Sequence, residues 1–194
     1  MKDVKDNNSM SESPRVINPA ALLLRSAMSD FEIPLTKYAV SILGDLEQAR
    51  DVVQDTFLKL YKQDPEKVRK KVKSWLFTVC RNHCYDLIKR NRRTSNLEED
   101  EISYITSNDD NPFQVISFLE GREEIDEKIK ILYSLIEELP SRQREVMRLK
   151  FQANLSYKEI AETIGISSSN VGFVMHSALK KLREDMKEKF PKKS

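Results

Sequence analysis

The sequence predicts an all-α protein made of two small helical bundles joined by an acidic flexible linker, with a helix-turn-helix in the C-terminal bundle. Three observations predict this. Apolar residues recur at helical spacing, strand-like alternation is absent, and only four glycines occur in 194 residues. A polar, acidic stretch separates the two periodic halves and therefore marks a linker.

The chain opens with a polar extension, residues 1–19, whose composition predicts disorder. The first bundle, residues 20–93, begins with a helix to about residue 43. We expect that helix to be interrupted near Pro34, because proline lacks the N–H that a helix interior needs. Gly44 makes a turn, and a second helix begins at Asp45.

The second helix has two distinct faces. Its buried stripe is expected to be Leu46, Ala49, Val52, Val53, Phe57 and Leu60. A separate face carries three polar groups around one exposed apolar residue, namely Asp51, Gln54, Asp55 and Leu58. The pattern alone leaves open whether this face binds a partner or is merely solvated.

A basic helix follows, from about Lys70 to Arg92, after Pro65 breaks the chain. Residues 62–93 hold eleven Lys or Arg against three acidic residues, which indicates polyanion binding unless the charges only solvate a helix face. Its basic end with one amide comprises Asn82, Lys89, Arg90, Arg92 and Arg93. The aromatic residues that could stack on bases are Trp75, Phe77 and Tyr85, although Trp75 is also typical of a core.

Cys80 and Cys84, with His83 between them, invite comparison with a zinc site. A closed zinc site needs four ligands, and the only other histidine, His176, lies in the second bundle. We therefore expect two buried thiols, with no metal and no cofactor.

The linker, residues 94–122, is rich in acidic and small polar residues. Its carboxylates at 98–101 could suggest a nuclease, but two-metal catalysis needs a rigid concave scaffold, so we expect no enzyme. Apolar runs near eighteen residues are absent, so no membrane insertion is expected and a cytoplasmic location is predicted.

The second bundle, residues 123–190, begins with a helix to about Glu138. We expect Pro140 at the first position of the next helix. The helix-turn-helix follows: Ser156 caps its first helix, Gly165 ends that helix, and Ser167 caps the second.

The second helix of such a motif enters a DNA major groove. Here it is expected to bury Val171, Val174, Ala178 and Leu182. Its outward residues are Ser168, Ser169, Asn170, Phe173 and His176, followed by Lys180 and Lys181. Asn170 is the one amide suited to a purine edge, while the lysines suit phosphates. Gly172 in this helix indicates close approach of DNA backbone or of an inhibitory protein.

Three motifs occur in order at specific spacing: "GDLEQARDVVQDTFLKLY" (44–61), "SWLFTVCRNHCYDLIKRNRR" (74–93), and "ELPSRQREVMRLKF" with "LSYKEIAETIGIS" (138–168). Over roughly residues 22–188 the chain resembles a bacterial RNA polymerase sigma factor of the sigma-70 family, in the extracytoplasmic-function (ECF) group. The resemblance implies that residues 20–93 are sigma region 2 and residues 123–190 are sigma region 4.

The resemblance also implies functions for the residues named above. Asp51, Gln54, Asp55 and Leu58 would bind the clamp of the polymerase's largest subunit. Trp75, Asn82, Lys89, Arg90, Arg92 and Arg93 would contact the −10 element, and the outward residues of the last helix would contact the −35 element. Further implied partners are the flap of the second-largest subunit and an anti-sigma factor. The alternative is a stand-alone helix-turn-helix transcriptional regulator, for which the sequence shows no evident ligand pocket or dimer seam.

Overall fold

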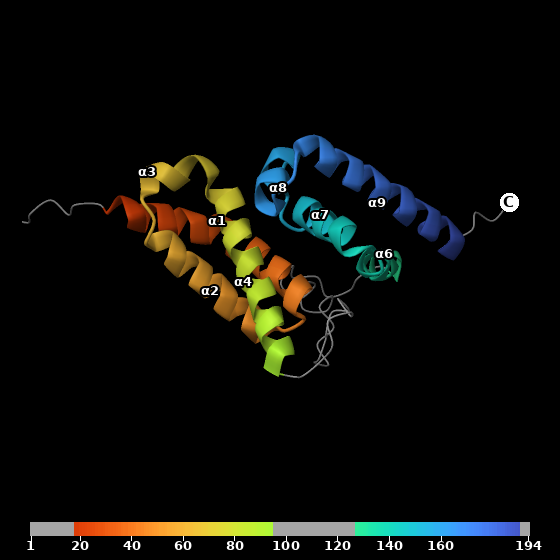
Figure 1. Cartoon of the computed structure of the whole chain (residues 1–194), viewed down its shortest axis with the longest axis horizontal. Helices are drawn as coiled ribbons and strands as arrows, with labels where there is room; N and C mark the ends of the chain where they lie inside the picture. Colours follow the sequence, from red (N-terminus) through yellow and green to blue (C-terminus); the bar gives the residue numbers. More distant parts are fainter. Residues whose placement is uncertain (1–17, 95–126, 191–194) are drawn as a thin grey trace, which may run out of the picture.

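The structure, a computed structural model, describes residues 18–94 and 127–190 and is helical throughout these two segments (Figure 1). The predicted all-α class is therefore confirmed. The expected disorder of the N-terminal extension and the expected flexible linker lie almost wholly outside the described residues. At their edges, Pro19 and Thr94 belong to helices.

Helix α1 (Pro19–Leu43) begins at the N-cap Asn18, whose side chain accepts a hydrogen bond from the Ala20 N–H. Pro34 lies inside this helix, so the predicted interruption was wrong. The missing hydrogen bond costs about 3 kcal/mol. Burial offsets that cost, because the turns after Pro34 place four fully buried side chains in the core: Leu35, Tyr38, Ala39 and Val40.

Helix α2 (Leu46–Tyr61) is separated from α1 by Gly44, whose φ of 72° is in the left-handed region that favours glycine. Asp45 caps α2 by accepting a hydrogen bond from the Gln48 N–H, as predicted. A short helix α3 (Pro65–Val68) and a 3-10 turn η1 (Arg69–Lys71) then lead into α4 (Val72–Thr94). Sequence reasoning missed α3, although proline at a first helical position after the cap Asp64 is a helix-start signal.

The second bundle contains α6 (Glu127–Glu137), α7 (Ser141–Phe151), α8 (Tyr157–Ile164) and α9 (Ser168–Lys189). Pro140 is the N-cap of α7 rather than its first residue, because its ψ of 141° is extended. Ser156 and Glu159 form a capping box at the start of α8, and Gly165 ends that helix at a φ of 70°. Ser167 caps α9 by accepting from the Asn170 N–H, so the predicted helix-turn-helix is present.

Packing within the bundles corrects two further expectations. In α9, Met175 is buried together with Val171, Ala178 and Leu182, whereas Val174 is only half-buried. Phe77 is fully buried and meets Tyr38 edge to face, with ring centroids 5.5 Å apart. Phe77 is therefore a core residue and no platform for bases.

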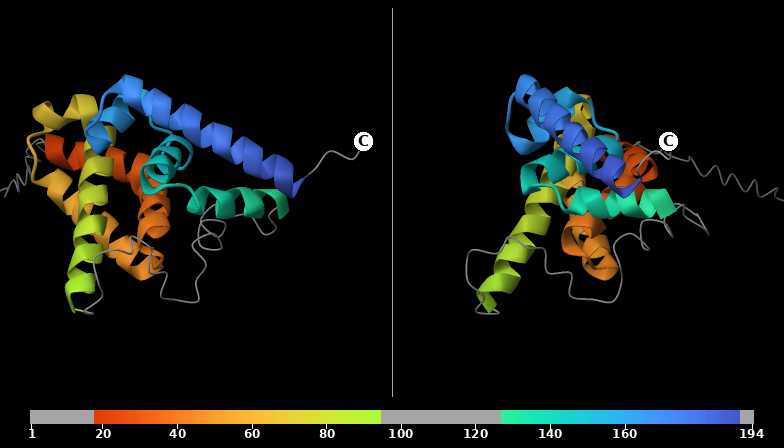
Figure 2. Two further views of the ribbon diagram at one scale, coloured as in Figure 1. Left: turned by 45° about the vertical axis from the view of Figure 1, so that its right-hand side comes forward. Right: turned by 90° about the vertical axis from the view of Figure 1, so that its right-hand side faces the viewer.

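The bundles lie against each other, with α8 beside α4 and α9 running away from that contact (Figures 1 and 2). Helices α1, α2 and α4 pack together, while α9 packs on α6, α7 and α8. This arrangement leaves the outer faces of α2 and α9 open.

Candidate nucleic-acid interface

The basic helix α4 presents its polar residues along one edge and at its C-terminal end. Asn82 is exposed, and its Oδ1 lies 3.4 Å from the Arg81 Nη1 that donates to it. Lys89 and Arg90 are exposed further along, whereas Trp75 is half-buried against the core. Arg92 and Arg93 belong to α4, but their side chains lie outside the described residues. The predicted −10 residues thus share one helix.

The predicted docking face of α2 is exposed as expected. Asp51, Gln54, Asp55 and Leu58 all reach solvent, and Leu58 is 52% exposed. Asp55 Oδ2 lies 3.8 Å from His83 Nε2 of α4, and the Asp55 side chain remains 54% exposed and thus open to a partner. On the opposite side of α2, five predicted core residues are buried: Ala49, Val52, Val53, Phe57 and Leu60.

The outer face of α9 carries every predicted −35 residue in an exposed position, namely Ser168, Ser169, Asn170, Phe173, His176, Lys180 and Lys181. Phe173 is 75% exposed, so most of its surface is available to a binding partner. The capping box at the start of α8 and the turn at Gly165 fix the direction in which α9 leaves α8. Positive charge is absent from this face until Lys180.

Glu159 keeps the start of the helix-turn-helix in place. Burial raises the pKa of its carboxyl, but the hydrogen bonds from the Ser156 N–H and hydroxyl and the charges of Lys73 and Lys150 together lower it by more, so the pKa lies below its ordinary value. Glu159 is consequently a carboxylate at neutral pH, which suits the N-terminus of α8.

Gly172 has no steric reason inside the chain to be glycine. A Cβ built on it would meet Tyr157 Cε2 at 3.8 Å, an ordinary contact. Tyr157, the exposed first residue of α8, lies under the Lys150 ammonium at 5.8 Å from its ring centroid. Sequence reasoning did not identify Tyr157 as the neighbour of Gly172, although an aromatic residue directly after the Ser156 cap was visible in the sequence.

A metal site receives no support in the described segments, where no group of three potential ligands occurs. Cys80 and Cys84 are buried free thiols, as predicted. A hydrogen bond with Cys80 and burial together raise the pKa of Cys84 well above its ordinary value, so this thiol stays protonated and unreactive. Among the described helices, none has the length and apolar character to cross a membrane.

Comparison with known families decides between the two DNA-binding hypotheses. Residues 29–94 match the sigma-70 region 2 family, and residues 129–182 match the sigma-70 region 4 family. The chain belongs to the sigma-70 family of RNA polymerase sigma factors, in the ECF group. The stand-alone regulator gains no support, and the predicted family and function are confirmed.

Relatives of this sigma factor align along most of their length. The ECF RNA polymerase sigma factor SigM of Bacillus subtilis is 28% identical over 147 residues, covering 76% of this chain and 85% of SigM. SigL of Mycobacterium tuberculosis is 28% identical over 171 residues, covering 87% of this chain and 91% of SigL.

Two solved complexes contain similar folds. CnrH, solved with the cytosolic domain of CnrY, is 23% identical with a TM-score of 0.57, covering 88% of this chain and 96% of CnrH. RpoE of Bartonella quintana, solved with the anti-sigma factor NepR, is 20% identical with a TM-score of 0.51, covering 84% of this chain and 91% of RpoE. These two likenesses concern the fold.

Proposed function

We propose that this sigma factor binds core RNA polymerase, contacts the −10 element through α4 and the −35 element through α9, and so directs promoter-specific initiation without catalysing a reaction itself. The observation that carries this proposal is the pairing of a basic helix with a helix-turn-helix in two bundles that match sigma regions 2 and 4. Such a protein works where the polymerase is, in the cytoplasm.

The face of α2 suits docking on the polymerase clamp. Three polar side chains surround the exposed side chain of Leu58. An apolar residue within a polar rim is the arrangement found at the centre of protein interfaces. Asp51 and Asp55 add negative charge, which favours a basic partner surface.

A second polymerase contact fits the groove between α6, α7 and α9. This groove has a volume of about 360 Å³ and is largely apolar, with Leu132, Ile136, Met147, Phe151 and Leu179 among its lining residues. An amphipathic helix binds such a groove through its apolar face. The flap of the second-largest subunit is the partner that we assign to it.

The two DNA contacts differ in chemistry. Asn82 can hydrogen bond to the edge of an unpaired base, while Lys89 and Arg90 contact backbone phosphates. On α9, Asn170 and the N-terminal amides lead the reading of bases, and Lys180 and Lys181 bind phosphates.

Run-off transcription with core polymerase and a library of promoters tests the proposal. The chain should produce transcripts with defined starts, and the variant with Asp51→Arg and Asp55→Arg should lose core binding while keeping its helical content. A variant with Glu184→Arg and Glu188→Arg, which changes the charge equally on α9, serves as the control. If the α2 variant still binds core as tightly as the parent, the docking face is wrongly assigned.

A further inference from the structure

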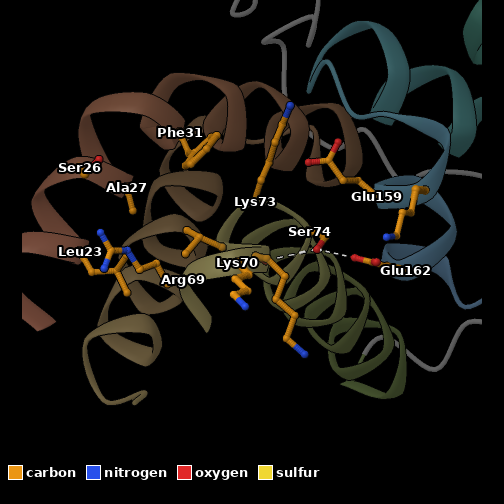
Figure 3. A pocket seen from close by; sticks show the side chains of 13 residues that line it. Leu23, Ser26, Ala27, Phe31, Arg69, Lys70, Lys73, Ser74, Glu159 and Glu162 are labelled. Atoms are coloured by element: carbon orange, nitrogen blue, oxygen red, sulfur yellow. Dashed lines mark hydrogen bonds between the residues drawn. The ribbon is translucent and has the colours of Figure 1, made fainter. Parts of the chain in front are cut away.

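A basic hollow lies where α1, η1, α4 and α8 meet, and we call it the η1 pocket (Figure 3). Its volume is about 500 Å³, within the range of sites that hold small molecules. Three kinds of side chain line it: cations, apolar groups and carboxylates. None of the described side chains assigned to the −10 and −35 elements is among them. Promoter contact through α4 and α9 therefore leaves the η1 pocket without a function.

The cations of the η1 pocket suit a group with two or more phosphates. Three segments supply them: Arg69, Lys70 and Lys71 come from η1, Lys73 from α4 and Lys158 from α8. All but Lys73 are exposed, and Lys73 Nζ already donates to the Asn154 carbonyl at 2.6 Å. Two carboxylates, Glu159 and Glu162, leave an excess of three positive charges. One phosphate group carries at most about two negative charges, so the excess suits a diphosphate or triphosphate.

One wall of the η1 pocket is apolar and suits a flat ring. Leu23, Ala27 and Phe31 of α1 form this wall together with Val72 of α4. Phe31 is half-buried, so the core holds its ring while part of the ring lines the pocket (Figure 3). Aromatic side chains stack on nucleobases, because every base has a π-face. A phosphate ligand without a ring would leave this wall unused.

The carboxylate of Glu162 supplies a third feature. Its Oε2 accepts a hydrogen bond from Ser74 Oγ at 2.9 Å, which holds the side chain at the edge of the pocket (Figure 3). A carboxylate has two oxygens and about four acceptor sites, so Glu162 can accept further bonds from the hydroxyls of a sugar. Glu159 instead accepts from the Ser156 N–H and hydroxyl. Carboxylates bind the ribose of nucleotides in this way in dinucleotide-binding folds.

We propose that the η1 pocket binds a ribonucleoside diphosphate or triphosphate. The phosphates contact Arg69, Lys70 and Lys71, the base lies against Phe31, and Glu162 accepts hydrogen bonds from the ribose hydroxyls. One ligand of this class matches the cations, the apolar wall and the carboxylate together. Because the pocket exists only in the folded chain, the nucleotide also stabilises the fold by mass action.

Promoter DNA is another polyanion available to the η1 pocket, but two features disfavour it. Glu159 and Glu162 would repel the continuous phosphates of a duplex. The apolar wall on α1 would face phosphates and sugars, because the bases of a duplex are stacked inside it. A small nucleotide meets neither obstacle, since its base is unpaired and its phosphates lie at one end.

The first test measures nucleotide binding to the free full-length protein by isothermal titration calorimetry. The ligands are the diphosphates and triphosphates of the four common ribonucleosides, with pyrophosphate as the comparison. At least one nucleotide should bind about tenfold more tightly than pyrophosphate, and about fivefold more tightly than its own 2′,3′-dideoxy form. Absence of binding by every nucleotide at about 1 mM would overturn the proposal. Equal affinity for pyrophosphate would overturn it as well.

A pair of lysine variants tests the phosphate contact. The variant with Lys70→Ala and Lys71→Ala should bind the nucleotide at least about tenfold more weakly than the parent. The variant with Lys187→Ala and Lys189→Ala loses the same charge at exposed positions at the end of α9, and it should bind like the parent. Equal nucleotide affinities in the two variants would refute the phosphate contact.

Two further variants separate the base contact from the ribose contact. Phe31→Leu keeps an apolar side chain in the core but removes the flat ring, so it should weaken nucleotide binding about threefold and leave pyrophosphate binding unchanged. Glu162→Ala should abolish the preference for ribose over dideoxyribose, because it removes the acceptor. A ribose preference that survives Glu162→Ala would contradict the position assigned to the sugar.

A final measurement distinguishes the nucleotide from DNA. The free protein and the variant with Lys70→Ala and Lys71→Ala are titrated with a labelled duplex that contains no promoter. If the variant binds this duplex more weakly while the parent binds no nucleotide, the η1 pocket is a DNA contact and the proposal fails. None of these measurements uses polymerase, so their outcome is separate from that of run-off transcription.

Discussion

Leu58 offers a quantitative test of the docking face on α2. Its side chain is 52% exposed, and complete burial of a leucine contributes about 1.5–3 kcal/mol, so a partner that covers the exposed half gains about 1 kcal/mol. Leu58→Ala should therefore raise the Kd for core polymerase about fivefold. Its effect on the free energy of unfolding should stay below about 0.5 kcal/mol, because the residue packs little in free protein.

Leu22 and Phe57 provide matched comparisons for this measurement. Leu22 on α1 is 53% exposed, so Leu22→Ala removes the same side chain at equal exposure but away from the docking face. Phe57 neighbours Leu58 but is buried, so Phe57→Ala should cost about 3–5 kcal/mol of stability. Core affinity is measured by titrating labelled protein, and unfolding by denaturant. Equal core affinities for Leu58→Ala and Leu22→Ala would refute the reasoning.

Two further predictions concern the helix-turn-helix. Gly172→Ala should raise the free energy of unfolding by about 0.5–1 kcal/mol, because the added Cβ meets only Tyr157 at an ordinary distance. A simultaneous fall in −35-dependent transcription would indicate close approach of the DNA backbone to Gly172. Unchanged stability in denaturant unfolding would contradict the packing argument. The pKa of Glu159 is lower in the folded protein than in the unfolded chain, where it is about 4.3. The charge of Glu159 therefore stabilises the fold at pH values above about 4.3, and this contribution disappears as the pH falls through the folded pKa. Glu159→Gln should accordingly be less stable than the parent at pH 7, and the difference should disappear as the pH falls through the folded pKa of Glu159. A difference in thermal melting that stays constant from neutral to acidic pH would contradict the assignment.

Local signals in the sequence predicted most of the helices correctly. Asp45, Ser156 and Ser167 are caps, and Gly44 and Gly165 end helices, because each of these functions depends on neighbours within a few residues. Pro34 was misjudged for the opposite reason. Its helix persists because of burial against α2 and α4, which depends on distant parts of the chain.

The same distinction applies to the predicted sites. Exposure of Leu58 and Phe173 follows from helical periodicity, so the sequence was sufficient to place them on outer faces. The pairing of Arg81 with Glu145 joins residues 64 positions apart in two bundles, and no periodicity predicts such a contact. The contacts of Glu145 with Arg81 and of Glu162 with Ser74 likewise bring acidic residues of the second bundle against the basic helix α4.

The weakly charged reading helix suits a protein that binds its promoter together with polymerase. Each DNA contact alone is modest, since α9 offers one amide and no positive charge before Lys180. Two modest contacts become strong together only when one body holds both at the correct spacing, because the second then binds at a high effective concentration. Core polymerase is the body that holds both helices in this way. Promoter selection is thereby coupled to assembly with polymerase, and a strongly charged α9 would weaken this coupling by binding DNA without it.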